Sequence, residues 1–227
     1  MSEQEMIDSF AYMNHSNGVD ICFAFDTTGS MSSIIQQVRT EVANTCNRLT
    51  ADIPGIRISI MAVGDYCDQF SSYVVRSLDF SNNPAQIESF VHGVSPSGGG
   101  DSPEAYEWAL YKARKLSWRE DDDVAKAFVM IGDDVPHEPT HTTAKIFWQD
   151  ELEELVKMNV KVYGVQANHG AHSQPFYARL AERSGGLHIW FSNFHLITKM
   201  FLALCYREAG AEHLEKYAKE VKESEKE

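Results

Sequence analysis

A short stretch, FAFDTTGSM at residues 23–31, joins an apolar run to one carboxylate and two hydroxyls at alternate positions. Asp26 follows the apolar run directly, and Thr28 and Ser30 lie on the same alternation. Oxygen ligands of this kind suit a hard divalent cation such as Mg²⁺, Mn²⁺ or Ca²⁺. An aspartate directly after a buried strand is also where some enzymes carry a nucleophile that accepts a phosphoryl group. The stretch therefore predicts either a cation site or a phosphoryl-transfer site.

Further carboxylates stand at the ends of other apolar stretches. Asp65 lies near the end of one, Asp133 and Asp134 follow another, AKAFVMIG, and the glycine-rich loop SPSGGGD supplies Asp101 just before a helix. In a parallel sheet, ligands bind beyond the carboxyl ends of the strands, near the point where strand order reverses. We therefore expect these side chains to converge on one edge of the sheet. The predicted metal ligands are Asp26, Thr28, Ser30, Asp101 and Asp133.

Apolar strands alternate with amphipathic helices along the chain. Strands are expected at 19–25, 56–66, 72–80, 125–132, 160–167 and 187–191, and helices at 32–50, 83–94, 102–118, 146–158, 175–184 and 194–209. Near-continuous apolar strands separated by helices indicate a parallel sheet covered on both faces. The stretch 72–80 is more polar and is expected to be an antiparallel edge strand. We predict a doubly wound α/β domain of Rossmann-like form with about six strands.

The chain length and composition are those of a folded domain of ordinary size. It has 227 residues, of which 43% are hydrophobic, and a formal net charge of −13. An acidic surface argues against a nucleic-acid or anionic-membrane partner. We expect an N-terminal segment at 1–17, one domain at 18–209, and a charged helical tail at 210–227 that is solvated and frays.

The sequence favours a reducing, cytoplasmic compartment. The first 17 residues include Glu3, Glu5 and Asp8 and show no signal peptide, and no apolar stretch approaches membrane-spanning length. The cysteines are widely spaced and form no CxxC pair, so all are expected to be buried thiols without disulfides. They are Cys22, Cys46, Cys67 and Cys205.

These motifs together resemble the von Willebrand factor type A domain and its metal-ion-dependent adhesion site. That family carries Asp-x-Ser-x-Ser after its first strand, a threonine from a second loop and an aspartate after a later strand. Asp26, Thr28 and Ser30 match the first motif, with threonine replacing the middle serine, and Asp133 in MIGDDVPH matches the last aspartate. Asp101 stands where the family usually has threonine, which is the larger departure.

The resemblance is closest to the intracellular type A domains that accompany alpha-kinases. The similar stretches are FDTTGSM, VGDYCD, SGGGDSPEA, LSWR and IGDDVPH, within residues 23–137. The resemblance implies a non-catalytic protein-binding module in which hydroxyls and aspartates hold the cation. A glutamate or aspartate of a protein partner then completes the coordination sphere. Asp101 as an extra carboxylate either tightens cation binding or occupies the partner's position.

Phosphoryl transfer of the haloacid dehalogenase type is the first alternative. DTTGS is similar to the ATPase signature Asp-Lys-Thr-Gly-Thr, with Asp26 as nucleophile and Asp133 or Asp134 holding Mg²⁺. Against it, residue 27 is threonine instead of lysine, and Thr28 replaces the second aspartate of the phosphatases.

Two further alternatives concern the histidines and the metal edge itself. Residues 137–141 spell HEPTH, which matches the zinc-protease pattern HExxH, but Pro139 and the position after a strand predict a loop where a zinc site needs a helix. His169 and His172 form a second pair, expected in a polar surface loop. The remaining alternative is a type A scaffold whose metal site is not functional.

Overall fold

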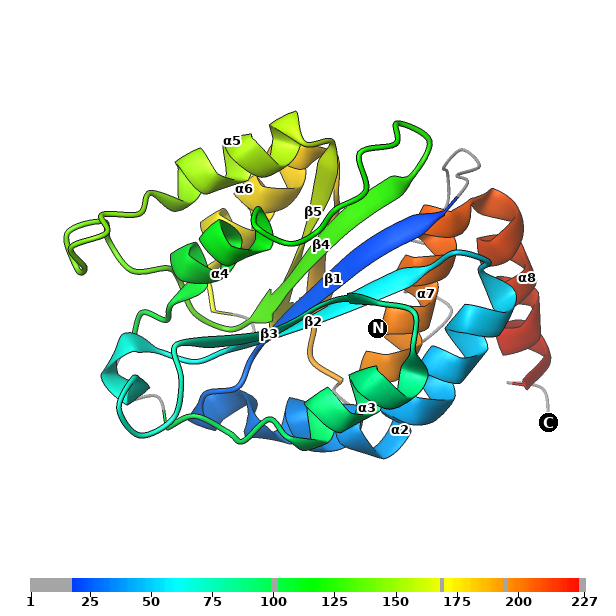
Figure 1. Cartoon of the computed structure of the whole chain (residues 1–227), viewed down its shortest axis with the longest axis horizontal. Coiled ribbons are helices and arrows are strands. Elements are labelled where there is room, and N and C mark those ends of the chain that lie inside the picture. The colour runs from blue at the N-terminus through cyan, green and yellow to red at the C-terminus, as the bar shows by residue number, and fades with distance from the viewer. Residues whose placement is uncertain (1–17, 99–101, 168–169, 194–195, 225–227) are drawn as a thin grey trace.

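The computed structural model describes residues 18–98, 102–167, 170–193 and 196–224. Six strands form one sheet in the order β3-β2-β1-β4-β5-β6 (Figure 1). The strands are β1 Val19–Asp26, β2 Arg57–Val63, β3 Val75–Ser81, β4 Ala125–Gly132, β5 Val160–Ala167 and β6 His188–Phe191. Strand order reverses between β1 and β4, the two central strands. The predicted doubly wound sheet is therefore confirmed.

Parallel pairing brings the carboxyl ends of five strands to one edge. β1 pairs in parallel with β2 and β4, as do β4 with β5 and β5 with β6, whereas β3 is antiparallel to β2. The antiparallel edge strand was thus predicted correctly. β2 ends at Val63 rather than at residue 66, so Asp65 lies in the loop beyond the strand. Both Asp65 and Asp26 consequently stand at this edge.

Helices cover both faces of the sheet (Figure 1). One face carries α2 Ser32–Asp52, α3 Pro84–His92 and α7 Ile197–Ala209, and the other carries α4 Tyr106–Ala113, α5 Trp148–Lys157 and α6 Gln174–Ser184. Successive residues of a strand point to opposite faces, so β1 contributes side chains to the hydrophobic core on each side of the sheet. Phe23 and Phe25 pack toward the α2 and α7 side, and Cys22 and Ala24 toward α4 and α6. No described helix has the length and apolar character that a membrane crossing requires.

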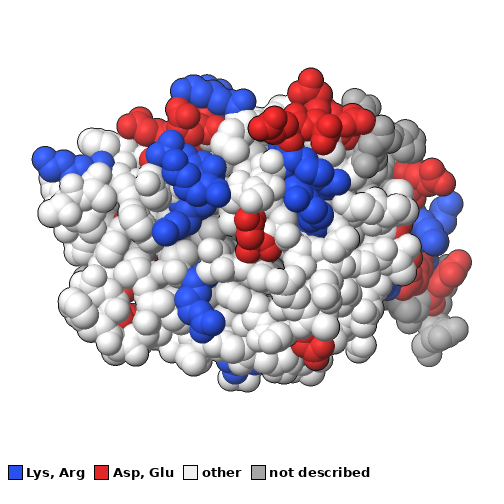
Figure 2. Space-filling view, in the orientation of Figure 1, with Lys and Arg blue, Asp and Glu red and all other residues white. Residues whose placement is uncertain are grey.

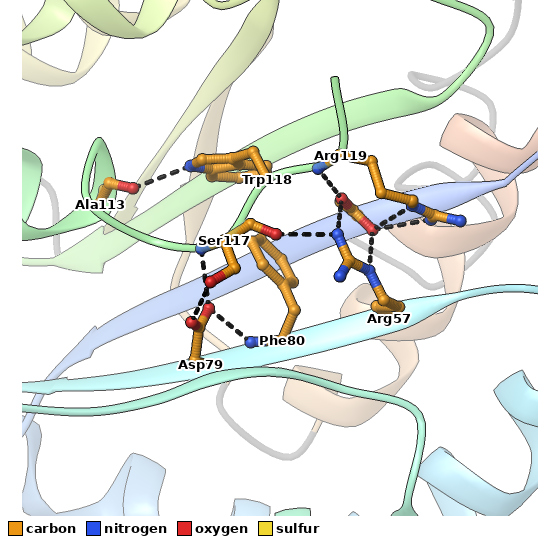
Figure 3. Close-up of polar contacts among 8 residues, drawn as sticks. Arg57, Asp79, Phe80, Ala113, Ser117, Trp118 and Arg119 are labelled. Carbon is orange, nitrogen blue, oxygen red and sulfur yellow. Dashed lines mark hydrogen bonds and ion pairs between the residues drawn. The ribbon is translucent and has the colours of Figure 1, made fainter. Parts of the chain in front are cut away.

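Helix α4 is shorter than the helix predicted at 102–118. Residues before Tyr106 follow the neighbouring loop instead, because the Glu104 amide donates to the Val135 carbonyl at 3.0 Å and Glu104 bridges Pro136. At the other end, the Trp118 indole N–H donates to the Ala113 carbonyl at 2.8 Å and turns the chain away from the helix (Figure 3). Tertiary contacts at both ends therefore override the helical pattern of the sequence.

Helix α8, Ala211–Ser224, corrects the expectation of a solvated tail. Leu214, Tyr217 and Val221 are buried on one face of this helix. Arg48 of α2 lies over the Tyr217 ring at 5.2 Å and forms an ion pair with Glu220. The described part of the tail thus packs on the domain, and only its outer face is solvated.

A buried carboxylate holds the loop after α4 to the opposite edge of the sheet. Asp20, fully buried at the start of β1, accepts hydrogen bonds from the side chains of Arg57 and Arg119 and from the Arg119 amide. Asp79 of β3 accepts from the amide and hydroxyl of Ser117 at 3.0 and 2.7 Å (Figure 3). The LSWR stretch thereby fixes the C-terminal end of α4 to three strands.

Candidate metal site

Asp26 is fully buried at the end of β1 and is held by three hydrogen bonds. Its Oδ1 accepts from the amide and hydroxyl of Thr28, at 2.7 and 2.6 Å, and its Oδ2 accepts from the Tyr106 hydroxyl at 2.6 Å. Burial raises the pKa of Asp26 to about 6, although the bonds from Thr28 and Tyr106 favour its ionised form. The nearby Asp133 carboxylate adds to the rise. Thr28 and the first residue of α4 together therefore hold the carboxylate in one orientation.

Thr27 ties the first motif to the glycine-rich loop. Its hydroxyl bonds the Val63 carbonyl at 2.9 Å and lies 3.3 Å from the Ser97 hydroxyl. The Gly29 amide donates to the Gly98 carbonyl at 3.2 Å. A Cβ on Gly29 would stand 3.2 Å from that carbonyl oxygen, so the close approach favours glycine. The loop that continues to Asp101 thus begins beside Thr28, while Asp101 itself lies outside the described residues.

Glu104 is a buried carboxylate at this edge that the sequence analysis did not select. Its side chain is 5% exposed, its Oε2 has no hydrogen-bond partner, and the Thr28 hydroxyl hydrogen-bonds its carboxyl group. Burial, with the neighbouring Asp26 and Asp65 carboxylates, raises the pKa of Glu104 to about 9. Glu104 belongs to the stretch SGGGDSPEA, which the sequence analysis quoted. It was not chosen as a ligand because residue 104 was expected to lie inside a helix that starts at 102.

Two other predicted ligands, Asp133 and Ser30, make no hydrogen bond to Asp26 or Thr28 that the described contacts include. Asp133 follows β4, half-buried, and acts electrostatically on Asp26 and Tyr106. Ser30 is exposed in a short 3₁₀ turn, Gly29–Met31. The structure thus brings Asp26 and Thr28 into direct contact and Asp133 near them, with Ser30 on the solvent side.

A buried network beside the site connects two loops with helix α4. His137 Nε2 lies 2.6 Å from Asp65 Oδ1, and Asp65 also accepts from the Cys67 amide at 3.2 Å. Burial by itself raises the pKa of Asp65, but hydrogen bonds led by His137 outweigh it and lower the pKa to about 2. Glu107 of α4 accepts from the Tyr66 hydroxyl at 2.6 Å and from the His137 amide at 3.0 Å. Asp65 therefore caps the loop after β2 and is the hydrogen-bond partner of His137.

The histidines do not form the helical zinc pattern. Residues 137–141 are not helical, and the His137 and His141 rings stack with their centroids 3.8 Å apart. His137 is already paired with Asp65. His172 lies 3.3 Å from Asp134 at the site's rim, and His169 is outside the described residues. Across 18–98, 102–167, 170–193 and 196–224, no three His, Cys, Asp or Glu residues gather as a metal cluster.

The described donors nevertheless fit a hard cation. Thr28 and Ser30 offer hydroxyl oxygens, and Glu104 Oε2 is a buried carboxyl oxygen without a hydrogen-bond partner next to the Thr28 hydroxyl. Carboxylate and hydroxyl oxygens are ligands that Mg²⁺, Mn²⁺ and Ca²⁺ accept. By contrast, both oxygens of Asp26 are hydrogen-bonded and inaccessible, whereas a phosphoryl-accepting nucleophile needs an exposed oxygen. The geometry therefore favours cation binding over phosphoryl transfer.

The face seen in Figure 2 carries no extended patch of positive charge. Lysine and arginine side chains alternate there with aspartate and glutamate side chains (Figure 2). Nucleic-acid binding depends on clustered positive charge, which this face does not present.

Comparison with known proteins agrees with the fold. A model of the von Willebrand factor type A domain matches residues 20–200. A putative ariadne-like RING finger protein of Acanthamoeba polyphaga mimivirus is 25% identical over 222 residues, which cover 88% of this chain and 21% of that protein. The chain thus spans about a fifth of the length of that relative. The family match covers most of the chain, and the chain therefore belongs to the von Willebrand factor type A family, whose domains generally serve in protein–protein interaction.

Proposed function

We propose that this domain binds a divalent cation at the edge of β1 and β4 and uses it to capture an acidic residue of a protein partner. The observation that carries the proposal is the arrangement at Thr28. Its hydroxyl lies between the Asp26 carboxylate and the Glu104 carboxyl, at the point where strand order reverses. Ser30, exposed beside it, offers a second hydroxyl from the solvent side.

Each group has a distinct part in this proposal. Thr28 and Ser30 supply neutral oxygens, and Asp101 and Asp133 supply charge directly or through water. Asp26, whose two oxygens are both hydrogen-bonded, supplies its charge through water. Tyr106 and the Thr28 amide hold Asp26 in place. The cation, when bound, supplies positive charge and an exchangeable coordination position on the solvent side. Mg²⁺, Mn²⁺ and Ca²⁺ all suit this donor set. No covalent chemistry is required, and we propose a cytoplasmic binding module without catalysis.

A peptide-binding experiment tests this function. The protein is loaded with Mg²⁺ or Mn²⁺, and an immobilised peptide library with varied central residues is screened for binding. We expect bound peptides to share a Glu or Asp, to lose binding when it is replaced by Gln or Asn, and to be released by EDTA. Thr28→Ala should abolish the same binding. Peptide binding of unchanged affinity in EDTA would contradict the metal bridge.

A further inference from the structure

We propose that Ser173 and Gln166 are positioning residues that hold Asp133, a predicted ligand, in place for the divalent cation. This inference rests on the proposed function, because both residues act on the same cation through Asp133. Gln166 lies near the carboxyl end of β5, the strand beside β4, and Ser173 lies directly before α6. Neither residue belongs to a motif that predicted the site.

Gln166 is a polar side chain that is fully buried in a largely apolar strand, where it pairs with Gly132 at the end of β4. A buried amide costs free energy unless it is hydrogen-bonded, so its partners indicate its role. Its nitrogen donates to the Gly170 carbonyl at 2.7 Å and to the Ser173 hydroxyl at 2.9 Å. Its oxygen accepts from His188 Nε2 of β6 at 3.1 Å. Gln166 therefore joins β6 to the residues that precede α6.

The Ser173 hydroxyl donates its proton in a direction that Gln166 determines. The hydroxyl oxygen lies 3.0 Å from the Asp133 carbonyl oxygen and 3.2 Å from the Gly170 carbonyl oxygen, and a serine hydroxyl has a single proton to donate. The Gly170 carbonyl already accepts from Gln166 at a shorter distance, 2.7 Å. The serine proton is therefore directed to the Asp133 carbonyl.

Ser173 does not use its hydroxyl to cap the helix that it precedes. A serine at an N-cap position commonly accepts a hydrogen bond from an amide of the first helical turn. Ser173 is the N-cap of α6 and is fully buried, but its side chain makes no such bond. The hydroxyl is bonded to the loop after β4 instead. Helix capping therefore does not account for this serine, whereas anchoring of Asp133 does.

The place of Asp133 matters to the cation because its carboxylate acts electrostatically on Asp26. Groups that orient a metal ligand through hydrogen bonds typically lower metal affinity by a factor of about 10–100 when they are removed. The bond from Ser173 holds the backbone of Asp133 itself, and so fixes where its carboxylate lies. Loss of the Ser173 hydroxyl therefore weakens cation binding through Asp133.

A Mn²⁺ titration followed by calorimetry tests this role on the full chain. The variants are Ser173→Ala, Gln166→Met, Thr28→Ala and the control Ser184→Ala. Ser184 lies on the same helix, and its hydroxyl bonds the amide and carbonyl of Val162 at 2.7 and 3.1 Å, near the amino end of β5. Urea unfolding of each variant in EDTA measures stability separately from cation affinity.

We expect Ser173→Ala to weaken Mn²⁺ binding at least about tenfold. Gln166→Met leaves the Gly170 carbonyl without its amide donor, so the Ser173 proton turns to that carbonyl and binding should weaken similarly. Ser184→Ala should lose stability in EDTA but bind Mn²⁺ as the wild type does, because its hydrogen bonds lie at the other end of the strand.

Each other outcome is decisive. Wild-type affinity in Ser173→Ala, with loss in Thr28→Ala, would overturn the positioning role and leave the proposed function standing. Equal weakening in Ser184→Ala would show a general effect of stability and would also overturn that role. Where Ser173→Ala does not fold, Gln166→Met decides in the same way. Absence of Mn²⁺ binding in the wild type would overturn both the positioning role and the proposed cation site.

Discussion

Replacing Asp20 by asparagine should destabilise the fold strongly without touching the candidate metal site. Asp20 is fully buried and receives five hydrogen bonds at 2.5–3.0 Å, four from the Arg57 and Arg119 side chains and one from the Arg119 amide. Removing one partner of a buried ion pair costs about 3–5 kcal/mol. The arginine side chains are 27% and 24% exposed, so water partly solvates them after the change. We therefore expect the lower end, about 3 kcal/mol.

The effect should depend on pH in a defined direction. Burial by itself raises the pKa of Asp20, but hydrogen bonds from Arg57 and Arg119 outweigh it and hold that pKa below its ordinary value of 3.8. A carboxylate with a lowered folded-state pKa stabilises the fold above its unfolded pKa, about 3.9. That contribution is lost as pH falls through the folded-state value. The difference in the free energy of unfolding between wild type and Asp20→Asn should thus have its full size at pH 7 and become smaller below about pH 4.

Urea unfolding in EDTA at pH 7 and at stepwise lower pH measures this difference. Asp121→Asn, an exposed change in the same loop, is the control and should stay within about 0.5 kcal/mol of wild type. A loss below about 1 kcal/mol in Asp20→Asn at pH 7 would refute the reasoning, because surface ion pairs alone account for that much. A difference that grows toward acid pH would refute the assigned sign.

Two substitutions and one labelling experiment test the local geometry. Tyr106→Phe removes the bond to Asp26 Oδ2 and should lower the free energy of unfolding in EDTA by about 1–3 kcal/mol, measured in urea; no loss would mean that this bond is not formed. Gly132→Ala would place a Cβ 2.3 Å from the Tyr106 hydroxyl and 2.8 Å from that of Tyr177, so overpacking should cost about 1–3 kcal/mol or more; a neutral result would show that the helices move freely. Cys67 is the exposed cysteine, so a thiol reagent should label it in the native protein and the three buried ones only after unfolding; rapid labelling of all four would contradict the packing.

The sheet was predictable because its strands are buried on both faces. A strand such as AKAFVMIG reads as a continuous apolar run, and all of it is strand in the structure. The stretch that includes β3 is more polar because an edge strand is less buried, and its polarity therefore predicted an edge position. The prediction that Cys67 is buried, which was made from its residue type, is wrong: Cys67 is exposed. Its neighbours lie in the loop beyond β2, where side-chain type says little about exposure.

The candidate site was predictable only in its first motif. Asp26 and Thr28 are two residues apart on one turn, so their contact follows from local geometry. Glu104 was missed because its place depends on a backbone pairing with residues 135–136, more than thirty positions away in the sequence. The pairing of His137 with Asp65 likewise joins two loops that no local pattern connects. Long-range contacts of this kind leave no periodic trace in the sequence.

The central claim is that a divalent cation binds through the Thr28 hydroxyl. It is tested most directly by thermal melts of chelated protein titrated with Mg²⁺, Mn²⁺, Ca²⁺ and Zn²⁺, using wild type, Thr28→Ala and the control Thr40→Ala. Thr40 is an exposed threonine of α2 whose hydroxyl donates to the Gln36 carbonyl.

At a cation concentration of about 100 times Kd, wild type and Thr40→Ala should melt roughly 5–10 °C higher than in chelator, and Thr28→Ala should not respond. A shift that survives in Thr28→Ala would contradict ligation by this hydroxyl and favour phosphoryl transfer. A response to Zn²⁺ alone would favour a zinc site in the HEPTH loop at residues 137–141. No response to any of the four cations would contradict the proposed cation site.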